Sequence, residues 1–300
     1  TSYRANRYYF TRNDTYHHVF PAETAEQLGL DTLSETDAHE AERYLRSREA
    51  GTQDWQQFND APESNPIGAL EALGFKEDER DLAVLFTNVV WDARLHFREN
   101  IYERMEDWIS DTVSYFKKNP SRKLIIRVHP GELISHSVSR ERVRELGCAQ
   151  NLPENITLVD AESKISSYYL GRKADINLIF ATKMGMELSI FRAPVVCCGD
   201  AWVRGKGATL DPANREEYLN ILSAKDWRDF YSERMAARGL AYANYFFNKK
   251  PIFFPYFEVA RDRKSFKTNI EVFKKSLNTP NSELYKIEEM MLRNDEVLNK

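Results

Sequence analysis

The sequence predicts an α/β protein built on a Rossmann-like, doubly wound parallel sheet. After Pro66, apolar runs of strand length alternate with helical segments, which is typical of right-handed strand–helix–strand units. Polar and glycine-rich residues follow these strands, as expected where a sheet binds a ligand. The 300 residues, 42% of them hydrophobic and 29% charged, suffice for one large or two small domains.

Three regions are expected along the chain. Residues 1–75 form an N-terminal segment and linker, 76–255 a Rossmann-like ligand-binding domain, and 256–300 a charged helical tail. In the first region a helix is predicted from Glu35 to Arg48 with Ser34 as its cap, and residues 59–66 are typical of a linker. In the tail a helix is predicted from Ser282 to Leu298.

The strands of the middle region are predicted from short apolar runs that suit burial on both faces of a sheet. They are Leu82–Val90, Lys123–Val128, Ile156–Val159, Ala174–Phe180 and Pro194–Cys198. The helices between and after them are predicted from helical spacing and from breakers such as Asn119-Pro120. They are Glu99–Lys118, Ser139–Leu146, a turn at Ile165–Leu170, Thr182–Phe191, Arg215–Leu222 and Trp227–Phe247.

Polar residues gather where the predicted strands end. They include Asn88 and Asp92 after the first strand, Arg127 to Glu132 after the second, Thr182 to Glu187 after the fourth, and Arg204 to Gly207 after the fifth. Ligands of an open parallel sheet bind beyond the carboxyl ends of its strands. Several such residues at one edge predict a binding site there.

His129 directly follows a strand and precedes Pro130. It either donates a hydrogen bond to phosphate or sugar, acts as an acid or base, or caps the strand and is satisfied by backbone. Arg127, on the same face, is either a ligand cation or the partner of Glu132.

Thr182 and the following amides are expected at a helix N-terminus, which favours anions. Glu187, one turn further, either accepts both hydroxyls of a ribose or simply complements the helix dipole. Gly185 either admits a ligand or permits close packing of helix on sheet.

The loop after the fifth strand carries Arg204, Gly205, Lys206 and Asp211. Cations between glycines suit a phosphate or a sugar carboxylate, although a solvated surface loop is the alternative. Asp211 is expected to order the loop. Trp202 lies in it beside the predicted site, whereas the other tryptophans are expected in the core.

Several classes of function lack support. The net charge of −4 is not the excess of positive charge that is typical of nucleic-acid-binding proteins. No apolar run approaches the roughly 18 residues of a membrane helix. Cys197 and Cys198 are expected as buried thiols of a reducing cytoplasm. His17 and His18 lack partners spaced as metal ligands and are expected to be exposed. No motif of a Ser/His/Asp hydrolase, a zinc protease or a P-loop occurs.

Between Leu82 and Tyr218 the chain resembles bacterial surface (capsule) polysaccharide biosynthesis proteins and, more distantly, is similar to the capsule Kdo transferases. Arg-Gly-Lys-Gly-Ala-Thr stands where the Kdo transferases have Gly-Trp-Gly-Leu-Thr. The resemblance is carried by residues 86–92 (Phe-Thr-Asn-Val-Val-Trp-Asp), 126–132 (Ile-Arg-Val-His-Pro-Gly-Glu), 152–156 (Leu-Pro-Glu-Asn-Ile), 182–187 (Thr-Lys-Met-Gly-Met-Glu) and 204–207.

This resemblance implies a glycosyltransferase of the GT-B type, in which two Rossmann-like domains face each other, with much of the acceptor domain absent here. It implies that residues 76–255 bind the nucleotide sugar, a CMP-Kdo-like donor among the candidates, without metal or cofactor. His129 and Glu132 would lie near donor phosphate or sugar, Glu187 near ribose, and Arg204 and Lys206 near phosphate or a sugar carboxylate. The acceptor would be a polysaccharide or a lipid-linked glycan at the cytoplasmic face of the inner membrane.

The expected function is therefore sugar transfer from a nucleotide-activated donor. Arg204, Lys206 and the amides at Thr182 would stabilise the leaving phosphate, and Asp92 would be the base or nucleophile. The alternatives are a nucleotide-sugar epimerase, a phosphotransferase, and a non-catalytic binding protein of polysaccharide export.

Overall fold

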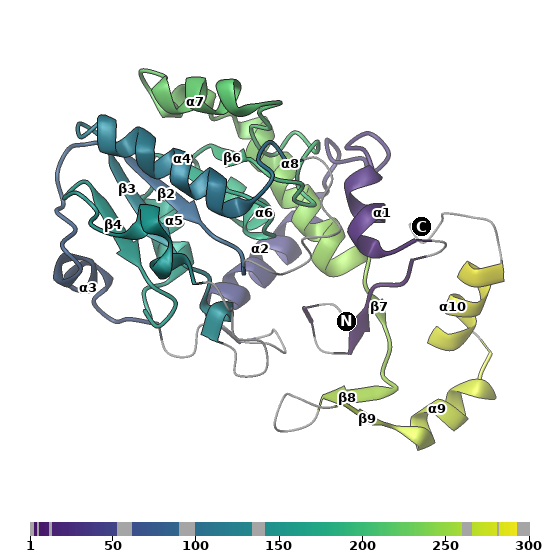
Figure 1. Cartoon of the computed structure of the whole chain (residues 1–300). Helices are drawn as coiled ribbons and strands as arrows, with labels where there is room; N and C mark the ends of the chain where they lie inside the picture. The colour runs from purple at the N-terminus through teal and green to yellow at the C-terminus, as the bar shows by residue number, and fades with distance from the viewer. Residues whose placement is uncertain are drawn as a thin grey trace.

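The computed structural model describes residues 3–4, 6–11, 14–52, 62–89, 100–133, 142–259, 266–280 and 282–292. Its centre is a parallel sheet of five strands in the spatial order β4-β3-β2-β5-β6 (Figure 1). Counted along the chain this is 3-2-1-4-5, the strand order of a Rossmann fold, so the predicted fold class is confirmed. The strands are β2 (Leu82–Phe86), β3 (Lys123–Arg127), β4 (Ile156–Val159), β5 (Ile176–Ile179) and β6 (Val195–Cys197).

Each face of the sheet is covered by its own set of helices. Ala83 and Leu85 of β2 face α4 (Met105–Lys118) and α7 (Arg215–Ser223), whereas Val84 and Phe86 belong to the cluster on the opposite face. This alternation follows from the two-residue period of a strand. The opposite face is covered by α2 (Glu35–Glu49), α3 (Pro66–Ala72), α5 (Ser167–Lys173), α6 (Met184–Leu188) and α8 (Glu233–Asn244).

Helix boundaries differ from the sequence prediction where capping residues intervene. The predicted helix Trp227–Phe247 is divided, because Ser232 accepts a hydrogen bond from the Met235 N–H at 3.2 Å and starts α8 there. A π-helical turn (Tyr245–Lys249) extends α8. The predicted helix Thr182–Phe191 shortens to α6 followed by a 3₁₀ turn. Most of the predicted helix Ser139–Leu146 lies outside the described residues, and a 3₁₀ turn occupies Val143–Glu145.

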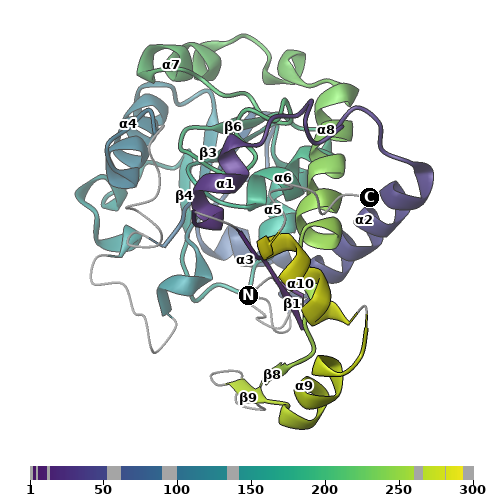
Figure 2. The ribbon, with the colours of Figure 1, turned by 90° about the vertical axis from the view of Figure 1, so that its right-hand side faces the viewer.

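The N-terminal segment shares the core of the sheet domain. Phe20 of α1 (Tyr16–Ala22) and Tyr44 of α2 lie in one hydrophobic cluster with Val84 of β2. The predicted cap of α2 is confirmed, since Ser34 accepts from the Asp37 N–H at 3.1 Å. In Figure 2, α1 lies in front of β6 and α6. Residues before the sheet are therefore part of the wall around its carboxyl edge.

The C-terminal part extends away from the sheet (Figures 1 and 2). Strand β7 (Ile252–Phe253) pairs with β1 (Arg7–Tyr8), and β8 (Phe257–Val259) pairs with β9 (Phe266–Thr268). Helices α9 (Ile270–Leu277) and α10 (Glu283–Leu292) follow, the latter inside the helix predicted for the tail. In the described parts of the chain, no helix combines the length and the hydropathy needed to cross a bilayer.

Candidate functional site

A cavity of about 90 Å³ lies at the carboxyl edge of the sheet. Its position follows from the strand order, because the chain turns to opposite sides after β2 and β5 and leaves a crevice between their ends. Residues that follow β2, β3, β5 and β6 line it together with residues of the N-terminal segment. The lining consists of Tyr3, His17, Asn88, Val89, His129, Ala181, Thr182, Lys183, Ala201 and Trp202.

Asn88 joins the ends of the two central strands. Its Nδ2 donates a hydrogen bond to the Ala181 carbonyl, which follows β5. Its Oδ1 is buried and has no hydrogen-bond partner among the described residues. A buried polar atom at the edge of a cavity requires an explanation, and a ligand that donates a hydrogen bond provides one. Thr182, also predicted, lines the same cavity, where its Oγ1 accepts from the Met184 N–H at 3.3 Å.

His129 lies in the cavity wall with a fixed tautomer. Its Nδ1 accepts a hydrogen bond from the Gly131 N–H at 2.9 Å, so the neutral ring carries its proton on Nε2. A Cβ on Gly131 would lie 2.7 Å from this Nδ1, which explains the glycine. Burial, together with Lys183 and Arg127, lowers the pKa of His129 to about 3. His129 is therefore a neutral hydrogen-bond donor through Nε2.

Lys183 lies in the cavity wall, and it is absent from the predicted site residues. Its ammonium lies 4.3 Å from the centroid of the Tyr3 ring. The signal in the sequence was its position directly after Thr182, at the end of the fourth strand. An exposed or half-buried ammonium at a strand end suits an anionic group of a ligand.

The structure corrects the predicted role of the glycine-rich loop. Arg204 donates to the carbonyls of Cys197 at 2.7 Å and Pro212 at 2.8 Å, so its guanidinium braces the loop. Lys206 is 1% exposed and donates to the carbonyls of Pro21, at 3.0 Å, and Glu23. Neither cation is among the cavity-lining residues.

The expectation that Asp211 orders this loop is confirmed. Its Oδ2 accepts from the Gly205 N–H at 2.8 Å, and its Oδ1 accepts from the Thr209 hydroxyl at 2.6 Å. Gly205 is exposed and has a φ of +73°, which a residue with a side chain rarely adopts. Both residues therefore shape the loop, and neither belongs to the cavity lining.

The structure also corrects the prediction that Glu187 binds a ribose. Its carboxylate is completely buried, 3.3 Å from Nη2 of Arg48, and accepts a hydrogen bond from the Tyr168 hydroxyl. It therefore binds two protein groups instead of a ribose. Gly185 serves close packing, its predicted alternative, because a Cβ there would lie 2.5 Å from Cδ1 of Ile179. Since α6 has only five residues, we assign no anion site to its N-terminus.

Arg127 is neither a ligand cation nor the partner of Glu132. Its guanidinium donates to the carbonyls of Asp160 at 2.7 Å and Ser163 at 3.1 Å, which ties β3 to the loop after β4. Glu132 is completely buried, and its Oε1 accepts from the Val143 N–H at 3.3 Å. Burial raises the pKa of Glu132 to about 7. Asp92, the predicted base or nucleophile, lies outside the described residues.

Aromatic rings from the N-terminal segment and from the loop after β6 form part of the cavity lining. The predicted place of Trp202 beside the site is confirmed, and its ring centroid lies 5.9 Å from that of His17. The expectation that His17 is simply exposed is wrong, because α1 brings it into the cavity wall. His18 lies 2.9 Å from Oδ1 of Asp14. The described residues contain no group of three or more His, Cys, Asp or Glu side chains that could hold a metal.

The tryptophans and cysteines of the core match their predictions where they are described. Trp108 and Trp227 are buried in the cluster under α4 and α7. Cys197 and Cys198 are buried free thiols. Trp55 and Trp91 lie outside the described residues.

No protein-family model matches the chain, and no curated protein matches it. Among solved structures, it is similar to the beta Kdo 2,4 transferase KpsC of Thermosulfurimonas dismutans, with 15% identity, a TM-score of 0.43, and coverage of 81% of this chain and 64% of that one. It is also similar to the UDP-GlcNAc 2-epimerase of Neisseria meningitidis bound to UDP-GlcNAc, with 17% identity, a TM-score of 0.41, and coverage of 60% and 47%.

A third similar structure is the C-terminal domain of the group 1 glycosyl transferase LpcC of Francisella tularensis. It has 14% identity and a TM-score of 0.32, and the match covers 61% of this chain and 94% of that one. The chain thus spans less than two thirds of the length of the KpsC transferase chain. At such low identity these structures assign no activity to this chain.

Proposed function

We propose that this chain is the donor-binding part of a GT-B glycosyltransferase, and that a nucleotide sugar binds at the cavity beyond β2 and β5. The observation that supports this most is the convergence of Asn88, His129 and Lys183 at the crevice where an open parallel sheet binds its ligands. The sequence resemblance between Leu82 and Tyr218 supports the same class. The acceptor is proposed to be a bacterial surface polysaccharide or a lipid-linked glycan at the cytoplasmic face of the inner membrane.

The size of the cavity limits which part of the donor it holds. Sites for drug-sized ligands occupy roughly 300–1,000 Å³. The 90 Å³ observed here is well below that range and suits a phosphate or part of a sugar. We therefore place the phosphate-linked sugar carbon in the cavity and the nucleoside on the open surface outside the strand ends.

Each polar residue of the cavity has a role in this proposal. Lys183 binds the donor phosphate and stabilises the charge that grows on it as the glycosidic bond breaks. His129 donates from Nε2 to a phosphate or sugar oxygen, and Asn88 accepts from a sugar hydroxyl through Oδ1. Arg204 and Lys206 are not part of this machinery, because both bind protein carbonyls.

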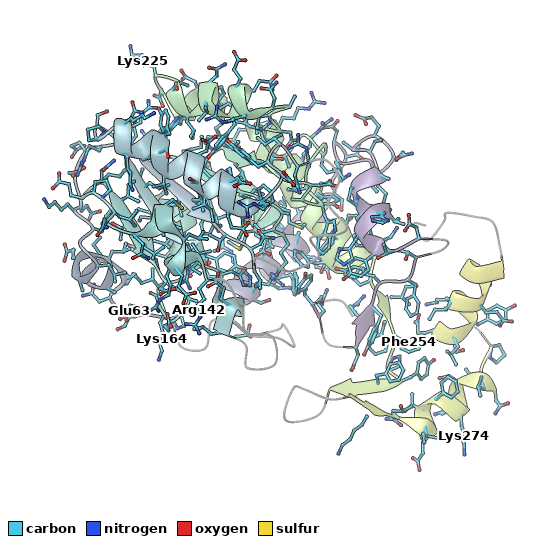
Figure 3. All side chains as sticks on the ribbon, in the orientation of Figure 1. Glu63, Arg142, Lys164, Lys225, Phe254 and Lys274 are labelled. Carbon is cyan, nitrogen blue, oxygen red and sulfur yellow. The ribbon has the colours of Figure 1, made fainter. Side chains whose placement is uncertain are left out.

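A thermal-shift panel of CMP, UDP, GDP and ADP tests the nucleotide proposal. A ligand at a hundred times its dissociation constant stabilises the folded protein by about 2.7 kcal/mol, and we expect one nucleotide to raise the melting temperature by several degrees. Lys183→Ala should remove this shift. Lys225→Ala, an exposed lysine at the end of α7 (Figure 3), should keep it. Absence of a shift with all four nucleotides would contradict the proposal.

Asp92→Asn tests the proposed base or nucleophile. We expect it to retain the nucleotide shift and to lose sugar transfer, because the substitution removes a carboxylate and keeps its size. The assay mixes each nucleotide sugar with and without a glycan acceptor. Full transfer by the variant would exclude Asp92 from this role. Conversion of the nucleotide sugar without acceptor would instead indicate an epimerase.

A further inference from the structure

The aromatic wall of the cavity is assembled from two segments that are distant in sequence. His17 belongs to α1, and Trp202 lies in the loop after β6. Their ring centroids are 5.9 Å apart. Tyr16 is on the same helix as His17, and its ring centroid lies 5.8 Å from that of Trp202. Such a wall keeps its shape only if α1 and the loop keep a fixed position relative to each other.

Helix α1 provides little that could hold its own end. It has seven residues, includes Pro21, and has no basic residue in its last turn. The last carbonyls of a helix lack partners within the helix and need donors from elsewhere. Here those donors come from the loop that carries Trp202.

Lys206 is the donor. It lies four residues after Trp202, and its ammonium binds the carbonyls of Pro21, at 3.0 Å, and Glu23, at the end of α1. The side chain is among the largest that are completely buried, and burial lowers the pKa of Lys206 to about 8. A buried ammonium is costly unless its hydrogen bonds are made, so this contact fixes the distance between helix and loop.

We propose that Lys206 is a positioning residue, which fastens α1 to the loop after β6 and thereby sets His17 beside Trp202 as the aromatic wall of the ligand cavity. The wall would take the apolar face of the sugar ring that the donor phosphate carries. That ligand assignment rests on the proposed function, whereas the placement of Trp202 by Lys206 does not.

Other contacts keep α1 on the core when Lys206 is replaced. The Tyr245 hydroxyl donates to Oε1 of Glu23 at 2.7 Å, and Nζ of Lys250 lies 2.7 Å from the same oxygen. Phe20 is completely buried and contacts Phe246 with ring centroids 5.4 Å apart. In a Lys206 variant the end of α1 should therefore shift relative to the loop after β6, while the fold is retained.

Lys206→Met tests the proposal, and Lys123→Met is its matched control. Lys123 is also buried, and its ammonium donates to the carbonyls of Lys76 and Asp78, both at 3.2 Å, remote from the cavity lining. Both variants should lose stability. Only Lys206→Met should weaken the binding of the nucleotide sugar that carries the nucleotide found to shift the wild type, by about tenfold, since sub-ångström placement governs binding.

A double variant separates positioning from general destabilisation. If Lys206 acts by placing His17, Lys206→Met combined with His17→Ala should bind no more weakly than the worse single variant. The proposal would be overturned if the losses of affinity in the two single variants multiplied in the double variant. It would also be overturned if Lys206→Met bound with wild-type affinity, or if Lys123→Met weakened binding equally.

A measurement without ligand keeps the test independent of the proposed function. The emission of Trp202 is obtained as the difference between each protein and its Trp202→Phe variant, and its quenching by acrylamide is measured. We expect Lys206→Met to raise this quenching about twofold or more and Lys123→Met to leave it unchanged. Unchanged quenching in Lys206→Met would overturn the positioning role. Increased quenching without binding of any nucleotide would contradict only the proposed function.

Discussion

Replacement of Arg48 by methionine is expected to lower the free energy of unfolding by about 3–5 kcal/mol. Nη2 of Arg48 lies 3.3 Å from Oε1 of Glu187, and the two side chains are 6% and 0% exposed. Removal of the guanidinium leaves a carboxylate buried without a counter-charge, which is far more costly than the loss of an exposed ion pair. Methionine retains an apolar stem but loses the guanidinium, whose central carbon lies 4.6 Å from the centroid of the Phe247 ring, so the loss of this contact adds to the expected cost.

Chemical denaturation at neutral pH measures this change, with two controls. Arg104→Met breaks an ion pair with Asp107 whose side chains are 50% and 45% exposed, and it should change the free energy of unfolding far less than Arg48→Met does. Adding Glu187→Gln to Arg48→Met removes the unpaired charge and retains an acceptor for the Tyr168 hydroxyl. That double variant should recover most of the loss. A single variant as stable as wild type, or a double variant as unstable as the single, would refute the assignment.

This ion pair also shows why the role of Glu187 could not be predicted from the sequence. The position of Glu187 one turn inside the helix after the fourth strand could be predicted, but its partner lies in α2, before the sheet begins. A carboxylate at that position faces either a ligand or the protein, depending on the helix packed over it. The same contact shows that α2 packs into the core of the sheet domain.

The strands, by contrast, could be predicted closely. The segment Ile156–Val159 agrees at both ends, and Leu82–Phe86 lies within its predicted run, because a strand buried on both faces must be apolar throughout. Their parallel order follows from the helices between them. The place of the site at the carboxyl edge follows from that order, and Asn88, His129 and Thr182 were predicted there and line the cavity.

The choice of cation could not be predicted in this way. Lys183 and Lys206 both follow strands, and only the backbone path of the glycine-rich loop turns Lys206 toward α1. The aromatic wall was missed for a similar reason, since tertiary packing alone brings His17 to Trp202. The concentration of aromatic residues before Pro21 was the available signal, because so many rings require a surface to pack against.

Glu132→Gln is expected to stabilise the protein increasingly as pH rises, by about 3 kcal/mol at pH 8. Burial raises the pKa of Glu132 in the folded protein to about 7, above its ordinary value of 4.5. Between these values the unfolded chain has lost this proton and the folded protein retains it. The contribution of Glu132 to the free energy of unfolding of the wild type therefore falls by about 1.4 kcal/mol for each unit that the pH rises in this range. Glutamine cannot ionise, and its oxygen can still accept from the Val143 N–H.

The comparison must be made as a difference between two proteins, because His129 titrates with the opposite sign. Its pKa is lowered to about 3 in the folded state, so its contribution to stability is lost as pH falls from about 6.5 toward 3. Both proteins share that contribution, and it cancels in the difference. Urea denaturation of each at pH 4, 6 and 8 should give curves that coincide at pH 4 and diverge above it. If the difference in free energy of unfolding between the two proteins did not change with pH, the pKa of Glu132 would not be raised in the folded protein. A group that stabilises the charged carboxylate would then have to offset its burial.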